Sequence, residues 1–172
     1  MEPNNIFKDR FSCREFLQKE IPEEYIKVIL EAGIWAPSAG NLQPWKFFVI
    51  KNRQLKEKLV EVAYNQEFIA QASFVIVVIA LPDVSAQRYG QRGKNLYCIQ
   101  DTAAAIENML LQGTILGVGS CWVGAFSEEK ARVVLNLKEN EMPVAILPFG
   151  YPKVFPEQDR WRKPLDIVVK FI

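Results

Sequence analysis

Hydrophobic and polar positions along the chain follow two different spacings. Apolar residues three to four positions apart predict helices after Pro22, over residues 54–64, over residues 100–116 and over residues 128–137. Short, nearly continuous apolar runs predict strands over residues 45–50, 74–81, 144–149 and 165–172. Residues 120–126 read as a short strand or a strand-to-turn segment. The two patterns alternate along the chain, which indicates a sheet packed by helices in an α+β or α/β arrangement.

Two of these elements also indicate where they lie in the fold. Residues 100–116 are apolar or small on nearly every side, so this helix is expected to be central rather than superficial. Residues 165–172 form a β-branched strand at the end of the chain, after a Pro-rich and charged connector over residues 152–164. Because a strand needs a neighbour, this segment is expected to reach a partner subunit.

Length and charge limit the possible partners. The chain has 172 residues and a formal net charge of +1, which fits one domain over residues 1–172 and predicts no general attraction to nucleic acid or membrane lipid. The apolar run at residues 74–81 is far shorter than the ~20 residues that span a bilayer. The N-terminal residues lack the apolar core of a secretory signal, so a cytoplasmic location is expected.

Two residue types exclude common catalytic sites. Cys13, Cys98 and Cys121 are odd in number and lack CxxC spacing, so we expect buried thiols rather than disulfides or a metal site. The chain contains no His, which removes Ser-His-Asp and Cys-His machinery and His-ligated metals. Chemistry must therefore come from carboxylates, Lys, Arg, Tyr or a cofactor.

The segment APSAGNLQPWKFFVI, residues 36–50, combines turn-forming residues with a strand. Pro37 and Pro44 restrict the backbone, and Gly40 allows close approach of another group. Hydrogen-bonding side chains that suit the edge of a flat heterocycle are Ser38, Asn41 and Gln43. The alternative is an ordinary helix end that runs through a polar loop into a strand.

Two basic clusters lie near the ends of the chain. Arg10, Ser12 and Arg14 alternate, so they project from one side of an extended segment and could clamp a phosphate. Arg160 and Arg162 repeat the same spacing beside Lys163. Taken alone, each cluster is more often an ordinary solvated charged surface or turn than a binding site.

Glycines mark a third candidate region. Gly117 and Gly119 follow a helix and precede a strand, the reverse of the order in a dinucleotide-binding fingerprint, so we reject that interpretation. Gly124 and Ala125 form a turn whose backbone can approach a planar ligand. Trp122 is expected in the core. Asn65 is either a helix-ending residue or a ligand contact.

Together, four segments resemble the FMN-dependent nitroreductase family, in the right order over nearly the whole chain. They are RFSCREF at residues 10–16, APSAGNLQPWKF at residues 36–47, QDTAAAIENMLLQGTILGVGSCWVGAF at residues 100–126, and RWRKPL at residues 160–165. The resemblance implies an α+β homodimer with a central, mostly antiparallel sheet wrapped by helices. It further implies exchanged C-terminal segments and one FMN at each of two interface clefts.

The resemblance also implies a set of flavin contacts. Arg10, Ser12 and Arg14 match positions that hold the phosphate, ribityl chain and pyrimidine edge, and Arg160 and Arg162 match a second phosphate contact. Pro37, Ser38 and Asn41 match a loop from the other subunit that lines the isoalloxazine ring. Asn65 matches a pyrimidine-side amide, and the Gly124 and Ala125 backbone faces flavin N5. Phe68 replaces a basic residue of some members, and the chain lacks room for the inserted lid helices of larger ones.

The reaction implied is reduction of bound FMN by NADH or NADPH, followed by reduction of a nitroaromatic, quinone or flavin in a ping-pong cycle. No residue is assigned as a general acid or base. Relatives with the same fold carry out reductive dehalogenation or flavin fragmentation, and a non-catalytic flavin sensor or storage protein is a third possibility. The physiological acceptor and the preferred nicotinamide stay open.

Overall fold

The computed structural model describes residues 6–155 and 160–172. Two segments used in the predictions above lie outside these ranges. They are residues 1–5, at the N-terminus where a secretory signal was not expected, and residues 156–159 of the 152–164 connector. The helices are α1 (Ile6–Asp9), α2 (Glu23–Ile34), η1 (Ala39–Asn41), α3 (Arg53–Val62), α4 (Phe68–Gln71), α5 (Pro82–Arg92), the π-helix η2 (Gly93–Tyr97), α6 (Cys98–Ile115), α7 (Glu128–Val134) and α8 (Leu165–Val168). The strands are β1 (Trp45–Ile50), β2 (Phe74–Ala80), β3 (Gly119–Ser120) and β4 (Met142–Gly150).

The four strands form one antiparallel sheet in the order β1-β2-β4-β3. Trp45 of β1 pairs with Ala80 of β2, and Phe74 of β2 pairs with Phe149 of β4. A register shift between Val78 and Ile79 interrupts the second ladder. This arrangement confirms the α+β class and the mostly antiparallel sheet that the family resemblance implies.

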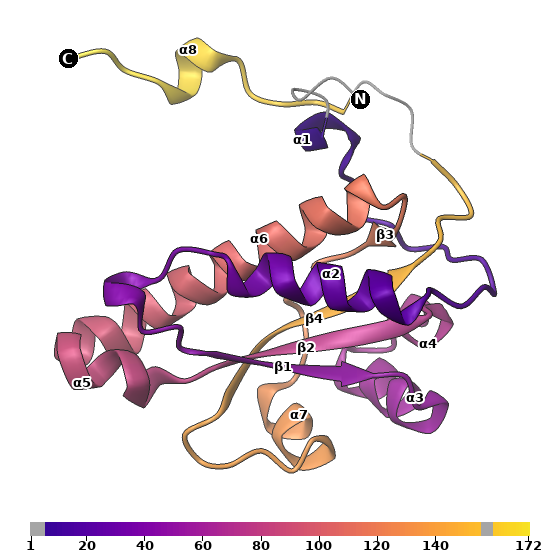
Figure 1. Ribbon diagram of the computed structural model, residues 1–172, viewed down its shortest axis with the longest axis horizontal. Helices are drawn as coiled ribbons and strands as arrows, with labels where there is room; N and C mark the ends of the chain where they lie inside the picture. Colours follow the sequence, from indigo (N-terminus) through magenta and orange to yellow (C-terminus); the bar gives the residue numbers. More distant parts are fainter. Residues whose placement is uncertain (1–5, 156–159) are drawn as a thin grey trace.

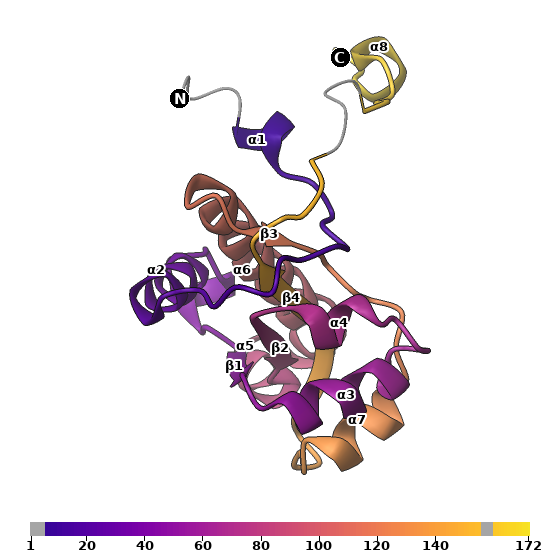
Figure 2. The same ribbon diagram turned by 90° about the vertical axis from the view of Figure 1, so that its right-hand side faces the viewer.

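Strand β2 is the centre of the sheet and is buried on both faces. Val75, Val77 and Ile79 face a core shared with α3 and α7. Phe74, Ile76 and Val78 face a second core shared with α2 and α6. Figure 2 shows these helices on opposite sides of the sheet. Each fully buried side chain of this size contributes about 1.5–3 kcal/mol, so the apolar run at residues 74–80 stabilises both layers.

Helix α6 is the long central helix that the sequence predicts. It crosses the sheet beside α2 (Figure 1), and eight of its 18 residues are buried. A Cβ at Gly33 of α2 would lie 2.9 Å from Cγ of Met109, so glycine at this position lets the two helices approach closely. This close packing holds α6 against α2.

The C-terminal arm, residues 160–172, differs from its prediction. The expected strand over residues 165–172 is wrong, because Leu165–Val168 forms one helical turn, with Val169 N donating to Leu165 O at 2.9 Å. No strand of the described chain lies beside the arm, so local helical bonds replace the ladder that a strand would need. Phe171 is 93% exposed, and the arm stands away from the sheet in both views (Figures 1 and 2).

Other differences concern short or polar elements. The hairpin of α5 and η2, residues 82–97, was not predicted, because its sequence is polar and carries glycines. The strand expected over residues 120–126 is limited to Gly119–Ser120 and an isolated bridge at Val123. Among the described residues, no helix combines the length and apolarity needed to cross a membrane.

Candidate functional site

The N-terminal segment that contains Arg10, Ser12 and Arg14 is anchored beside β3. Ser12 forms a parallel bridge with Ser120, and Cys13 N donates to Ser120 O at 2.8 Å. These backbone contacts place the first basic segment along β3, at the edge of the sheet and just before the turn at Gly124.

The two basic segments meet at this edge. Arg160 donates hydrogen bonds to the backbone oxygens of Arg10 and Lys8, which ties the C-terminal arm to the N-terminal segment. Burial lowers the pKa of Arg160, and the nearby positive charges of Arg10 and Arg162 lower it further. We name Arg10, Arg14, Arg160 and Arg162 the arginine cluster.

Two groups next to the arginine cluster define its surroundings. Burial raises the pKa of the Cys121 thiol, and the positive charges of Arg14 and Arg10 oppose this effect. Arg10 Nε lies 3.8 Å from Glu107 Oε1 on α6, a contact too long and exposed to neutralise the cluster. All three cysteines are buried, as the sequence predicted.

Asn65 and the Gly124–Ala125 turn are also neighbours. Asn65 has φ +63° at the end of α3, which confirms a helix-ending role and leaves its side chain exposed. The adjacent Gln66 Nε2 donates to Ala125 O at 3.1 Å and joins the two turns. No described atom would lie within 4 Å of a Cβ at Gly124, so the backbone there is open to a ligand.

Two aromatic residues near these turns lie in different surroundings. Trp122 is 40% exposed, so the expectation that it belongs to the core is wrong. It lies between Cys121 and Val123, whose side chains turn into the core, so its own ring points outward. Phe68 packs against the apolar core under α3. The position where some relatives carry a basic residue is thus used for packing.

The loop of residues 36–44 has a strained, well-defined backbone. Gly40, Asn41 and Gln43 have φ values of +59°, +56° and +50°. Ser38 Oγ accepts a hydrogen bond from Gln43 N at 3.0 Å. The side chains of Pro37 and Asn41 are exposed. Non-glycine residues with positive φ persist where the surrounding contacts enforce them, so this loop is built for a particular shape.

Asp101 of α6 makes one of those contacts, although no motif or spacing in the sequence pointed to it. Its side chain is buried, and Oδ1 accepts a hydrogen bond from Ala39 N at 3.0 Å. Oδ2 has no hydrogen-bond partner among the described residues. Burial raises the pKa of Asp101, and the Ala39 N–H bond opposes this effect.

The predicted site residues thus fall into two groups. One group surrounds β3 and consists of Arg10, Ser12, Arg14, Asn65, Gly124, Ala125, Arg160 and Arg162. The other is the 36–44 loop with Pro37, Ser38 and Asn41, which lies at the opposite end of α6, beside α5 (Figure 1). Among residues 6–155 and 160–172, no hydrogen bond or ion pair joins the two groups.

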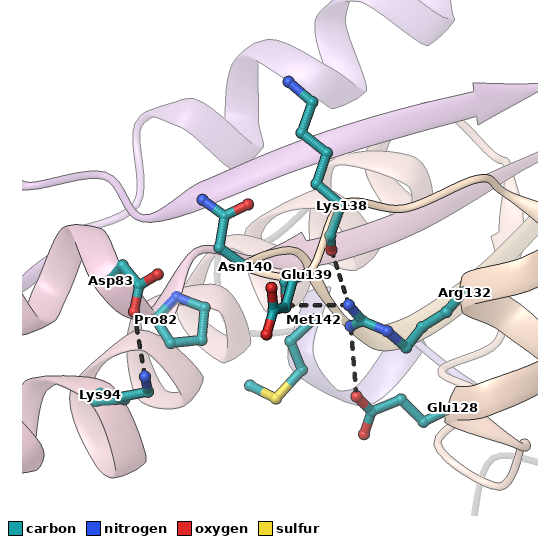
Figure 3. Close-up of a pocket in the computed structure, with 9 residues that line it drawn as sticks. All are labelled: Pro82, Asp83, Lys94, Glu128, Arg132, Lys138, Glu139, Asn140 and Met142. Atoms are coloured by element: carbon teal, nitrogen blue, oxygen red, sulfur yellow. Dashed lines mark hydrogen bonds and ion pairs between the residues drawn. The ribbon is translucent and has the colours of Figure 1, made fainter.

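A separate pocket of about 740 Å³ lies between the α5–η2 hairpin and the segment from α7 to β4 (Figure 3). Its charges are largely satisfied within the protein. Lys94 Nζ lies 3.2 Å from Asp83 Oδ1, and Arg132 donates to backbone oxygens of Lys138, Glu139 and Glu141. None of the predicted site residues lines this pocket.

Comparison with known proteins decides the family. The profile described as "Nitroreductase family" matches residues 7–66 and 60–151. The chain belongs to the nitroreductase family. The resemblance inferred from the four sequence segments is thereby confirmed, and the protein is a nitroreductase-family oxidoreductase that uses NAD(P)H.

Individual relatives agree with this membership. The chain is 37% identical over 148 residues to a protein of Archaeoglobus fulgidus named "Putative NADH dehydrogenase/NAD(P)H nitroreductase", covering 84% of this chain and 82% of that protein. A Methanothermobacter thermautotrophicus protein of the same name is 32% identical, with 88% and 78% covered. The crystal structure of a nitroreductase family protein from Clostridium difficile superposes with a TM-score of 0.88 at 31% identity, covering 99% and 98% of the two chains.

Proposed function

We propose that this nitroreductase is an FMN-dependent enzyme that transfers electrons from NADH or NADPH to nitroaromatics, quinones or flavins in a ping-pong cycle. The contact that brings Arg160 against the segment of Arg10, Ser12 and Arg14 is the observation that carries this proposal. Burial is the main reason for the lowered pKa of Arg160, and the positive charges of Arg10 and Arg162 add to it; a bound phosphate would offset this excess of positive charge.

The residues around β3 have the donor set that FMN requires. Arg10, Arg14 and Arg160 would hold the phosphate, with Ser12 as a neutral donor. Asn65 would hydrogen-bond the pyrimidine edge, and the open backbone at Gly124 and Ala125 would lie against the ring. When bound, FMN would supply the hydride and electron transfer that protein side chains cannot perform themselves.

The second half of the site would come from another copy of the chain. The 36–44 loop lies away from the arginine cluster, so Pro37, Ser38 and Asn41 would line a flavin held by the partner of a homodimer. The exposed apolar side chains of the C-terminal arm support the same assembly, because burial against a partner would remove them from water. We propose that the arms are exchanged between two single-domain subunits.

The absorption spectrum of the purified protein tests the cofactor. We expect a yellow protein with about one FMN per chain, whose visible absorption is lost anaerobically on addition of NADH or NADPH. Initial rates at several fixed acceptor concentrations should give parallel double-reciprocal lines, as a ping-pong cycle requires. A colourless protein that takes up no added FMN would refute the proposal.

The role of the 36–44 loop is tested separately with Asn41→Ala and Pro37→Gly. Both variants should elute as dimers and should show weaker FMN binding or an altered range of acceptors. If Asn41→Ala leaves both FMN affinity and turnover as they were, this loop does not contact the flavin.

A further inference from the structure

The α5–η2 hairpin packs directly against the 36–44 loop. Gly40 has φ +59°, and a Cβ there would lie 2.7 Å from Tyr89 Oη and 2.8 Å from Arg88 Nη1. A ligand that extends over this loop therefore meets Arg88 and Tyr89 next.

The hairpin carries an uncompensated positive charge. Its charged residues are Asp83, Arg88, Arg92 and Lys94, and Asp83 pairs with Lys94 at 3.2 Å. Arg88 and Arg92 are exposed, and neither forms an ion pair with a carboxylate in the described part of the chain. Two guanidinium groups therefore face solvent with their charge available to a ligand.

Two tyrosines hold these guanidinium groups in place. Arg88 Cζ lies 5.5 Å from the centre of the Tyr89 ring, and Arg92 Cζ lies 5.4 Å from the centre of the Tyr97 ring. The two rings pack edge to face at 5.2 Å. Arg92 Nε also donates to Tyr97 Oη at 2.9 Å, which leaves its terminal nitrogens free. Ordering side chains before binding lowers the entropy lost when a ligand is bound.

We propose that Arg88 and Arg92 bind the phosphate groups of the nicotinamide dinucleotide. The inference rests on the proposed function, in which the 36–44 loop borders the ring where the nicotinamide must stack. The rest of the dinucleotide then extends across the loop to the hairpin. Guanidinium groups with free, planar N–H donors match phosphate oxygens in geometry and charge.

The test compares two hydride donors on the FMN-loaded enzyme with a neutral quinone as acceptor. NADH carries phosphates, and 1-benzyl-1,4-dihydronicotinamide carries none. For Arg88→Gln/Arg92→Gln, we expect the ratio of kcat/KM with NADH to kcat/KM with the benzyl donor to fall roughly tenfold. The loss should lie mainly in the KM for NADH, and Arg88→Lys/Arg92→Lys should restore part of it.

Arg53→Gln is the matched control, because Arg53 is an exposed arginine on α3, on the other side of the sheet from α2 and α6. Its donor ratio should equal that of the unaltered enzyme. An unchanged ratio in the double glutamine variant, or an equal loss with both donors, would overturn the phosphate assignment. Failure of the unaltered enzyme to bind FMN or to oxidise either donor would instead refute the proposed function.

Discussion

The two ends of α6 hold their neighbouring segments by different means. At the β3 end, backbone hydrogen bonds such as Cys13 N to Ser120 O fix the N-terminal segment, and Arg160 binds backbone oxygens of the same segment. At the other end, local backbone bonds such as Asn41 N to Ser38 O are supplemented by two side chains, the Asp101 carboxylate and the Ser38 hydroxyl.

This contrast predicts how each region responds to substitution. Apart from Arg160, whose side chain binds backbone oxygens of the N-terminal segment, side chains at the β3 end can change without moving this backbone. Their loss should therefore affect the ligand rather than the fold. In the 36–44 loop, side-chain contacts reinforce the local backbone bonds. Substitutions there should alter stability and turnover together.

Deletion of residues 160–172 should have the largest effect, because it removes both the proposed dimer arm and two members of the arginine cluster. We expect a monomer with FMN affinity reduced roughly 100-fold or more. Sedimentation and FMN titration measure the two properties. The full-length Arg160→Ala/Arg162→Ala variant should lose FMN affinity and remain a dimer. Retention of FMN by the truncated chain would contradict the proposed role of the arm.

Arg14→Ala tests the claim that the β3 end is fixed by its backbone. Arg14 is exposed and forms no hydrogen bond within the described residues. Its loss should raise the Kd for FMN about tenfold while changing the free energy of unfolding of the FMN-free protein by less than about 0.5 kcal/mol. Fluorescence titration and urea unfolding provide the values, with Arg53→Ala as control. A large loss of stability would show that this end also depends on side chains.

Asp101→Ala should have the reverse pattern at the other end of α6. It leaves the Ala39 N–H without its acceptor, so the free energy of unfolding should fall by about 1 kcal/mol. Turnover should fall more than FMN affinity does. Asp101→Asn retains an acceptor oxygen and should restore turnover. Equal behaviour of the alanine and asparagine variants would argue against a role for this hydrogen bond.

The smallest expected effect is a pH dependence of the same contact. Burial raises the pKa of Asp101, so the native protein holds this proton more tightly than the unfolded chain does. The stability that Asp101 contributes is therefore greatest below its unfolded pKa and is lost as pH rises through the native pKa. Relative to D101N, the natural protein should lose stability in urea unfolding as pH rises above about 4, the ordinary Asp pKa. A flat difference would mean that Asp101 titrates normally.

The pattern of apolar residues along the chain correctly predicted the strongly apolar elements that pack in the centre of the fold. The run at residues 74–81 and the all-round apolar helix at residues 100–116 both became central elements. The terminal strand failed for the converse reason, because residues 165–172 have no neighbouring strand in the chain. The pattern of apolar residues indicates which residues prefer burial. It does not show which strand or subunit will cover them.

The candidate site shows the same limit. Motif order grouped Arg10 with Arg160, and the structure places them in contact. Asp101 and Arg88 were missed, because a single acid on an apolar helix and an arginine in a polar hairpin have no distinctive spacing. Their importance comes from contacts with Ala39 and Gly40, about 50 to 60 residues away in sequence.

The position of β2 in the sheet has a consequence for synthesis of the chain on the ribosome. Strand β1 precedes β2, but its other neighbour, β4, begins about 60 residues later. At about 5–20 residues per second, one edge of an uncharged, fully apolar strand stays unpaired for roughly 3–12 s. Such an edge is a template for aggregation. The strand that contributes most to both cores is thus the segment of the nascent chain most in need of a chaperone.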